Sequence, residues 1–203
     1  LAGPIPSELG TISALQTLSL SGNQLTGHIP RQLGDLGALK TLNLSYNEVD
    51  GKIPASLGQL SNLEELRLRC NNLSGEYSKA DLRRSNIQSI LCFSRIALLL
   101  AGPIPPELGK LGALKRLDLR INMLDGHIPR QLGDLGALET LDLGYNKLEG
   151  EGVRRCVLES GEIIFFCPAE LFCSPCPLSG HIPPELGALS ELRVLWLNSN
   201  KLT

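Results

Sequence analysis

The chain has 203 residues, with 19 basic and 21 acidic side chains, a net charge of −2 and a hydrophobic content of 42%. The balanced charge argues against a nucleic-acid-binding protein, because such domains are usually clearly basic. The apolar content argues against a disordered chain, and the longest purely apolar run, residues 96–101, is far shorter than a membrane span. Because aromatic residues make up only 4% of the chain, its core has to be built from leucine.

A 24-residue repeat organises the first third of the chain. Leucines recur with this spacing at Leu15, Leu39 and Leu63, and asparagines recur with it at Asn23, Asn47 and Asn71. A period in the twenties with the pattern Leu-x-x-Leu-x-Leu-x-x-Asn-x-Leu predicts a solenoid. Each repeat then forms one coil, and its leucines are buried only when the neighbouring coils stack on it.

Each position of the repeat has a predicted structural role. Residues 42–44 alternate apolar and polar side chains, which indicates a short strand with Leu42 and Leu44 inside and Asn43 outside. The Asn after the strand can bond the backbone of its own coil and of the next, so stacked copies should form a ladder. The Gly-x-Ile-Pro segment keeps the return path extended or turned. The Leu-Gly pair that follows predicts a short helical turn that the glycine stops.

The frame breaks at residues 76–102 and again at residues 151–180, and it resumes after each break. Removing either segment restores the 24-residue register, and both segments begin after the same glycine of the motif, Gly75 or Gly150. Two interpretations remain open: the segments are degenerate, lengthened repeats, or they are foreign sequence inserted at a repeat boundary. In both cases we expect a single solenoid domain over residues 1–203.

The full motif, Leu-x-x-Leu-x-Leu-x-x-Asn-x-Leu-x-Gly-x-Ile-Pro-x-x-Leu-Gly-x-Leu, resembles the plant-type leucine-rich repeat (LRR) family. Such repeats occur in the ectodomains of plant receptor kinases, in polygalacturonase inhibitors and in Roco-type proteins of algae and protists. The resemblance implies an α/β solenoid, specifically a right-handed LRR superhelix with a concave parallel β-sheet. It does not identify the ligand, because this fold is a scaffold for many partners.

Five of the six cysteines lie in the two irregular segments, and Cys173 and Cys176 form the one Cys-x-x-Cys pair. A structural zinc site needs four converging ligands. The remaining spacings supply no second close pair, so we predict no metal site; a disulfide is an alternative if the protein is secreted. No Ser-His-Asp or Cys-His arrangement and no phosphate-binding loop occurs in the sequence. We therefore predict neither a cofactor nor an enzymatic activity.

Binding is the remaining class of function, and we expect it at the outward positions of the strands. These positions differ from repeat to repeat, whereas the Leu and Asn positions hardly vary. Arg and aromatic side chains most often anchor interfaces, and we expect the tyrosines and Trp196 at equivalent exposed places. The candidate ligand-binding residues are Tyr46, Glu65, Arg67, Arg69, Arg116, Asp118, Arg120, Asp142, Tyr145 and Trp196. Alternatively, the Arg and Asp side chains form only solvated cross-strand pairs.

The sequence therefore predicts a non-catalytic module that binds a protein or peptide ligand on the concave sheet of a larger receptor or signalling protein. One alternative is a structural or regulatory spacer of an intracellular multidomain signalling protein, such as a Roco-type GTPase or a kinase. Another alternative is carbohydrate or cell-wall recognition through the aromatic residues. A receptor ectodomain would be extracellular, and a Roco-type protein would be cytoplasmic.

The positions of Leu1 and Thr203 in the repeat lead to two further expectations. Leu1 and Thr203 both lie in the middle of a repeat, so we expect a piece of a longer protein whose terminal coils expose leucines and tend to self-associate. We expect no contact with nucleic acid and no membrane contact by this piece.

Overall fold

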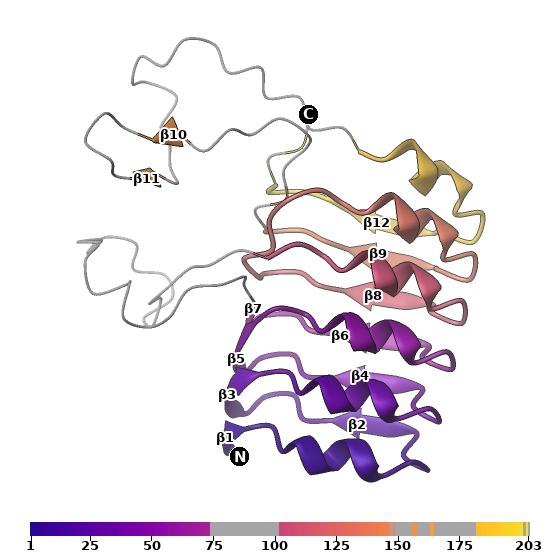
Figure 1. Cartoon of the computed structure of the whole chain (residues 1–203). Helices are drawn as coiled ribbons and strands as arrows, with labels where there is room; N and C mark the ends of the chain where they lie inside the picture. Colours follow the sequence, from indigo (N-terminus) through magenta and orange to yellow (C-terminus); the bar gives the residue numbers. More distant parts are fainter. Residues whose placement is uncertain are drawn as a thin grey trace.

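The computed structural model is a stack of coils (Figure 1), and it describes residues 1–73, 102–146, 148, 156–157, 163–164, 182–200 and 202. The elements in chain order, with η for a 3-10 helix, are β1 (Ala2–Pro4), η1 (Ser7–Thr11), β2 (Thr17–Ser19), β3 (Gln24–His28), η2 (Arg31–Asp35), β4 (Thr41–Asn43), β5 (Glu48–Gly51), η3 (Ala55–Gln59), β6 (Glu65–Arg67), β7 (Asn72–Leu73), η5 (Pro106–Lys110), β8 (Arg116–Asp118), η6 (Arg130–Asp134), β9 (Thr140–Asp142), β10 (Cys156–Val157), β11 (Ile163–Ile164), η7 (Pro184–Ala188) and β12 (Val194–Trp196). Strands β10 and β11 form a short antiparallel pair.

The described coils share one long parallel sheet, with the strand order β12-β9-β8-β6-β4-β2. Equivalent leucines face each other across every pair of neighbouring strands, as Leu18 faces Leu42 and Leu42 faces Leu66. This equal register places the same repeat position on the same side of the sheet in every coil. We call the outward side of this sheet, opposite the 3-10 helices, the concave face.

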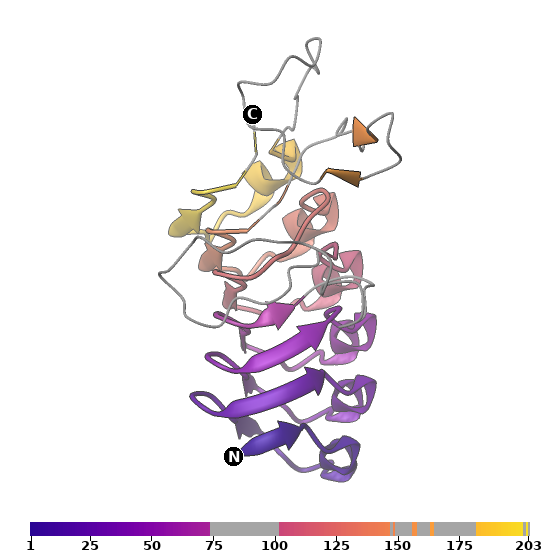
Figure 2. The ribbon, with the colours of Figure 1, turned by 90° about the vertical axis from the view of Figure 1, so that its left-hand side faces the viewer.

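The 3-10 helices form a second layer on one side of the sheet (Figure 1, in front of the strands), and a third layer closes the coils along one edge. Each described 3-10 helix begins directly after a proline, such as Pro30 with φ −63° or Pro129 with φ −63°, because proline fixes an extended entry to the turn. Along the edge, β1, β3, β5 and β7 form a four-stranded parallel sheet (Figure 2). The predicted α/β solenoid with a parallel sheet is thus confirmed, and its described helices are all short 3-10 helices of five residues.

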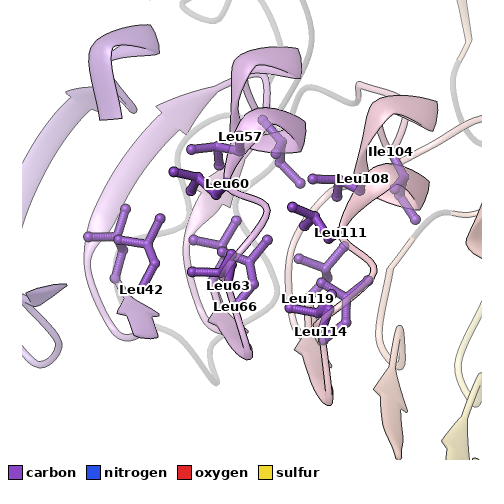
Figure 3. Close-up of a cluster of buried hydrophobic side chains, with 14 of the residues drawn as sticks. Leu42, Leu57, Leu60, Leu63, Leu66, Ile104, Leu108, Leu111, Leu114 and Leu119 are labelled. Carbon is purple, nitrogen blue, oxygen red and sulfur yellow. The ribbon is translucent and has the colours of Figure 1, made fainter. Parts of the chain in front are cut away.

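Leucine fills the space between these layers, as the composition required. Leucines from the strands, such as Leu42 and Leu66, meet leucines from the 3-10 helices, such as Leu57 and Leu108 (Figure 3), and all four are fully buried. Burial of one such side chain contributes about 1.5–3 kcal/mol. The core is continuous from coil to coil because each leucine layer packs on the next one.

The predicted asparagine ladder is present. Asn47 donates from Nδ2 to the carbonyl oxygen of Leu20 in the preceding coil at 2.9 Å and to that of Leu44 in its own coil at 3.0 Å. Its Oδ1 accepts the backbone N–H of Leu25 at 3.1 Å. Asn71 and Asn146 make the same three bonds. The amide side chain therefore satisfies buried backbone groups that the turn leaves without a partner.

The glycine of each Leu-Gly pair has a different role from the predicted one. The helix η2 continues past Gly34 to Asp35, so the glycine does not stop the turn. A Cβ atom built on Gly34 would instead lie 2.8 Å from the carbonyl carbon of Ser56 in the next coil. Gly58, Gly109 and Gly133 are equally close to the following coil. The absent side chain allows successive 3-10 helices to stack backbone on backbone.

The coils on either side of each irregular segment are direct neighbours. Strand β6 pairs with β8, and β9 pairs with β12, in the same register as every other pair. The ladder also crosses both junctions, since Asn122 donates to Leu68 at 3.0 Å and Asn200 donates to Leu143 at 2.8 Å. Asn122 Oδ1, however, is buried without a hydrogen-bond partner among the described residues. Apart from the flanking Gly102 and two short strands, the irregular segments lie outside the described residues.

Deleting residues 76–102 is expected to leave the solenoid intact, because the deletion joins Gly75 to Pro103 and recreates the Gly-Pro-Ile-Pro sequence of residues 3–6. The urea midpoint should be equal or higher, since a long loop closure is removed, and the m-value should be unchanged. As a control, deletion of one regular repeat, residues 28–51, should lower the m-value. If the 76–102 deletion lowers both the m-value and the midpoint, that segment supplies packed surface to the fold.

Candidate functional site: the concave face

The concave face consists of three columns of outward side chains that run along the stack of coils. The first column is Thr17, Thr41, Glu65, Arg116, Thr140 and Val194; the second is Ser19, Asn43, Arg67, Asp118, Asp142 and Trp196; the third is Ser21, Ser45, Arg69, Arg120, Gly144 and Asn198. Of the six described coils, the first two are neutral and rich in hydroxyl groups, and the third and fourth are charged. The fifth contributes Thr140, Asp142 and Gly144, and the sixth contributes Val194, Trp196 and Asn198. The charge and polarity of the face therefore change along its length.

Four arginines gather in the middle of this face because β6 and β8 are neighbouring strands. Arg67 and Arg69 come from β6 and the residues after it, and Arg116 and Arg120 come from β8 and the residues after it. A depression of about 220 Å³ lies beside them, lined by Ser21, Asn43, Ser45, Tyr46, Arg67, Arg69, Arg116 and Asp118. The structure thus brings together candidate residues that the irregular segment separates in sequence.

The arginines differ in how their charge is balanced. Arg67 forms a salt bridge with Glu65 of the same strand at 2.7 Å. Arg69 and Arg120 instead stack on tyrosines, with the guanidinium carbon 5.5 Å from the Tyr46 ring centre and 5.0 Å from the Tyr145 ring centre, respectively. Such cation–π pairs contribute about 0.5–1 kcal/mol at exposed sites. The Nε atoms of Arg67, Arg69 and Arg120 are buried without a hydrogen-bond partner among the described residues.

The second column also holds the ends of the strands in place. Asn43, Asp118 and Asp142 each accept, through Oδ1, the backbone N–H two residues further on, at 3.1, 3.2 and 3.0 Å. This local bond is the Asx turn that Asn and Asp favour. These three side chains therefore shape the turn that presents the third column.

Asp142 was predicted to face a ligand, but only 3% of its surface is exposed. Burial disfavours the ionised carboxylate and raises the pKa of Asp142. The bond from the Gly144 N–H opposes this shift, the neighbouring Asp118 carboxylate adds to it, and the charges of Arg120 and Arg69 oppose it. Asp142 is therefore a buried turn residue at the floor of the face.

Replacing Asp142 by Asn is expected to stabilise the fold at pH 7, by no more than about 1 kcal/mol, because Asn43 makes the same turn without a charge. The folded pKa of Asp142 lies above its unfolded value, so its ionised form lowers the free energy of unfolding above that folded pKa. This loss of stability disappears as the pH falls through the folded pKa of Asp142 and the carboxylate takes up a proton. In urea unfolding, the gain in stability of D142N over the unmodified chain should be smaller at pH 4 than at pH 7. The control D134N, at an exposed site, should show no gain in stability. An equal gain at both pH values would contradict this assignment.

The aromatic candidates do not occupy equivalent places, contrary to the sequence-based expectation. Tyr46 and Tyr145 lie in the turn after the strand, with φ 58° and 54°, and about half of each side chain is exposed. Trp196 belongs to strand β12 itself, faces Asp142 in the register and is 50% exposed. The residue equivalent to the tyrosines in the last coil is Ser199, with φ 57°.

Two features of the site were not among the predicted residues. Ser21, Asn43 and Ser45 line the depression beside the arginines; the repeat places them at outward positions, but their small polar side chains did not single them out as ligand-binding candidates. The stacking of Arg69 on Tyr46 was also missed, although residues about one period apart lie on adjacent coils.

The described residues contain no group of three or more potential metal ligands. The cysteines considered for zinc or a disulfide lie where no side chain is described. In the same described part of the chain, no helix is long and apolar enough to cross a membrane.

Two family models match the sequence, and both describe a leucine-rich repeat. One matches residues 13–73 and the other matches residues 138–155. No curated protein matches the chain.

Solved structures resemble the chain over most of its length. The LRR ectodomain of the receptor kinase GASSHO1/SCHENGEN3 from Arabidopsis thaliana, in complex with CASPARIAN STRIP INTEGRITY FACTOR 2, has a TM-score of 0.60 and 32% identity, covering 99% of this chain and 20% of that one. The Arabidopsis receptor kinase HAESA, in complex with the peptide hormone IDA and the co-receptor SERK1, has a TM-score of 0.67 and 28% identity, covering 98% and 24%. A plant ice-binding protein has a TM-score of 0.58 and 31% identity, covering 74% and 40%.

The chain thus spans between 20% and 40% of the length of these three proteins. The repeat motif, the ladder, the stacked coils and the family models agree with one another. The chain is therefore built from leucine-rich repeats, and in structure it is similar to the ectodomains of plant receptor kinases.

Proposed function

We propose that the chain is a non-catalytic module that binds an extended, acidic peptide on its concave face. The observation that supports this most is the cluster of Arg67, Arg69, Arg116 and Arg120 on two neighbouring strands. Two solved structures are consistent with it: HAESA is in complex with the peptide hormone IDA, and RGFR1 is a plant peptide hormone receptor in complex with RGF2.

The chemistry of the cluster favours an anionic partner. Among the described residues, Arg69 and Arg120 form no salt bridge, and their buried Nε donors have no acceptor. Buried donors of this kind normally have a partner. A carboxylate suits them, because it accepts two parallel hydrogen bonds from one guanidinium group.

The shape of the face favours a peptide over a small molecule. The depression of about 220 Å³ is open and smaller than most small-molecule sites, whereas the columns extend over all the described coils. Trp196 and Val194 on β12 add an apolar patch at one end, and an exposed Trp is a frequent anchor of interfaces.

Selection of peptides from a displayed random library, with the full chain as bait, tests this function. We expect acidic peptides to be enriched, and we expect their affinity to fall at least tenfold in the double variant R69Q/R120Q, because hydrogen bonds to charged groups contribute about 1.5–3 kcal/mol. The matched control is R31Q/R130Q, which removes the same charge from exposed positions on η2 and η6. Equal losses in both variants would show that binding follows net charge and not the concave face.

A further inference from the structure

Two arginines of the concave face stack on tyrosines from opposite flanking coils. Arg69 and Arg120 follow neighbouring strands, since the N–H of Cys70 donates to the carbonyl oxygen of Arg120 at 3.0 Å. Arg69 nevertheless stacks on Tyr46 of the coil before its own, and Arg120 stacks on Tyr145 of the coil after its own. Two like charges on adjacent strands repel each other, and the two rings lie on opposite flanking coils.

The tyrosines that hold these arginines occupy a position that does not suit them structurally. Tyr46 and Tyr145 have φ of 58° and 54°, in the left-handed region, and the first coil has Gly22 at this position with φ 69°. A bulky side chain there costs backbone energy, and about half of each ring is exposed, so burial returns little. The fold itself therefore does not require an aromatic residue at either position.

We propose that Arg69 with Tyr46 and Arg120 with Tyr145 form two separate anion-binding arms that read two acidic side chains three residues apart in one extended peptide. Neighbouring parallel strands lie about 4.8 Å apart. In this arrangement each guanidinium group is displaced toward its own ring, which places the two groups roughly two strand spacings, or about 10 Å, apart. This inference rests on the proposed peptide-binding function and specifies its ligand.

The conformation of the peptide follows from that distance. In a polyproline II helix, side chains three residues apart point the same way and are about 9 Å apart. In a β-strand, side chains that share a face are two residues, or about 7 Å, apart, and side chains three residues apart point to opposite faces.

Four acetylated and amidated peptides with equal flanks test the spacing, with a fluorescent label and anisotropy as the readout. Their cores are Glu-Pro-Pro-Glu, Pro-Glu-Glu-Pro, Glu-Pro-Glu-Pro and Gln-Pro-Pro-Glu. We expect the first to bind at least fivefold more tightly than the second and third, which have the same charge. R69Q or R120Q alone should reduce its affinity to that of the single-acid peptide.

Tyr46→Gly and Tyr145→Gly test the tyrosines as positioning residues. Glycine suits the positive φ, so the urea midpoint should change little, while the preference for Glu-Pro-Pro-Glu over Pro-Glu-Glu-Pro should fall about threefold or more. Retention of that preference in both variants would overturn the role of the tyrosines. If the chain binds all the doubly charged peptides equally, or none of them, the two-arm inference is wrong; selected acidic peptides that still lose affinity in R69Q/R120Q would leave the proposed function in place.

Discussion

Replacing Gly109 by Ala is expected to destabilise the solenoid by about 3 kcal/mol, the upper end of the usual cost of overpacking. A Cβ atom at this position would lie 2.7 Å from the carbonyl carbon of Gln131 and 2.8 Å from its Cβ. The obstacle is the backbone of the next 3-10 helix, which cannot rotate away as a flexible side chain can. The two coils would have to separate, and the leucine layers on both sides would lose contact.

Gly112, three residues further along the same coil, provides the matched control. A Cβ atom there would meet nothing within 4 Å, so Gly112→Ala should leave stability unchanged or raise it slightly through the unfolded state. Urea unfolding followed by circular dichroism measures both variants. Similar midpoints for G109A and G112A would show that the coils do not stack backbone on backbone.

Replacing Asn71 by Ala is expected to cost about 3–5 kcal/mol. Asn71 is 6% exposed; it donates to the carbonyl oxygens of Leu44 at 2.9 Å and Leu68 at 3.0 Å, and it accepts the N–H of Val49 at 3.3 Å. Alanine leaves all three backbone groups buried without a partner, and each such group costs about 1–3 kcal/mol. The loss weakens the contact between the second and third coils as well as the turn itself.

Asn62→Ala controls for the loss of an amide from this coil. Asn62 donates only to the carbonyl oxygen of Gly37, at 2.8 Å, in an exposed position where water can replace it, so its loss should cost less than about 1 kcal/mol. Chemical denaturation of both variants at pH 7 gives the comparison. An Asn71→Ala cost no greater than that of Asn62→Ala would show that the ladder contributes little to stability.

The framework of the fold could be predicted from the sequence because its period is strict. Leu42 and Leu66 are buried in the core, and Asn47 and Asn71 bond the backbone of adjacent coils. The 24-residue spacing alone is enough to identify both kinds of position. The role of Gly34 could not be predicted in the same way. A glycine that ends a helix and a glycine that allows a close approach look alike in a sequence, and the distance to the next coil decides between them.

The candidate site was predictable as a face but not as a set of contacts. The outward positions locate Arg67 and Arg116, yet the spacing leaves open whether the 27-residue segment between the two repeat frames adds a lengthened repeat there or leaves β6 and β8 as neighbours. The burial of Asp142 depends on the strands packed beside β9 and on the arginines around it. Pairing of Arg69 with Tyr46 depends on a side-chain conformation, which no periodic pattern specifies.

The proposed site exists only if β6 and β8 lie side by side, and a pair of engineered cysteines tests this directly. Glu65 and Arg116 are register partners on these strands, so E65C/R116C should form a disulfide under mild oxidation, because facing positions on adjacent strands lie within the reach of such a bond. Glu65 and Thr140 are one strand further apart, so E65C/T140C should not. Mass spectrometry of the digested chain identifies the linked peptides. A bond between 65 and 116 alone is the predicted result, and its absence under conditions that leave the chain folded would contradict the account.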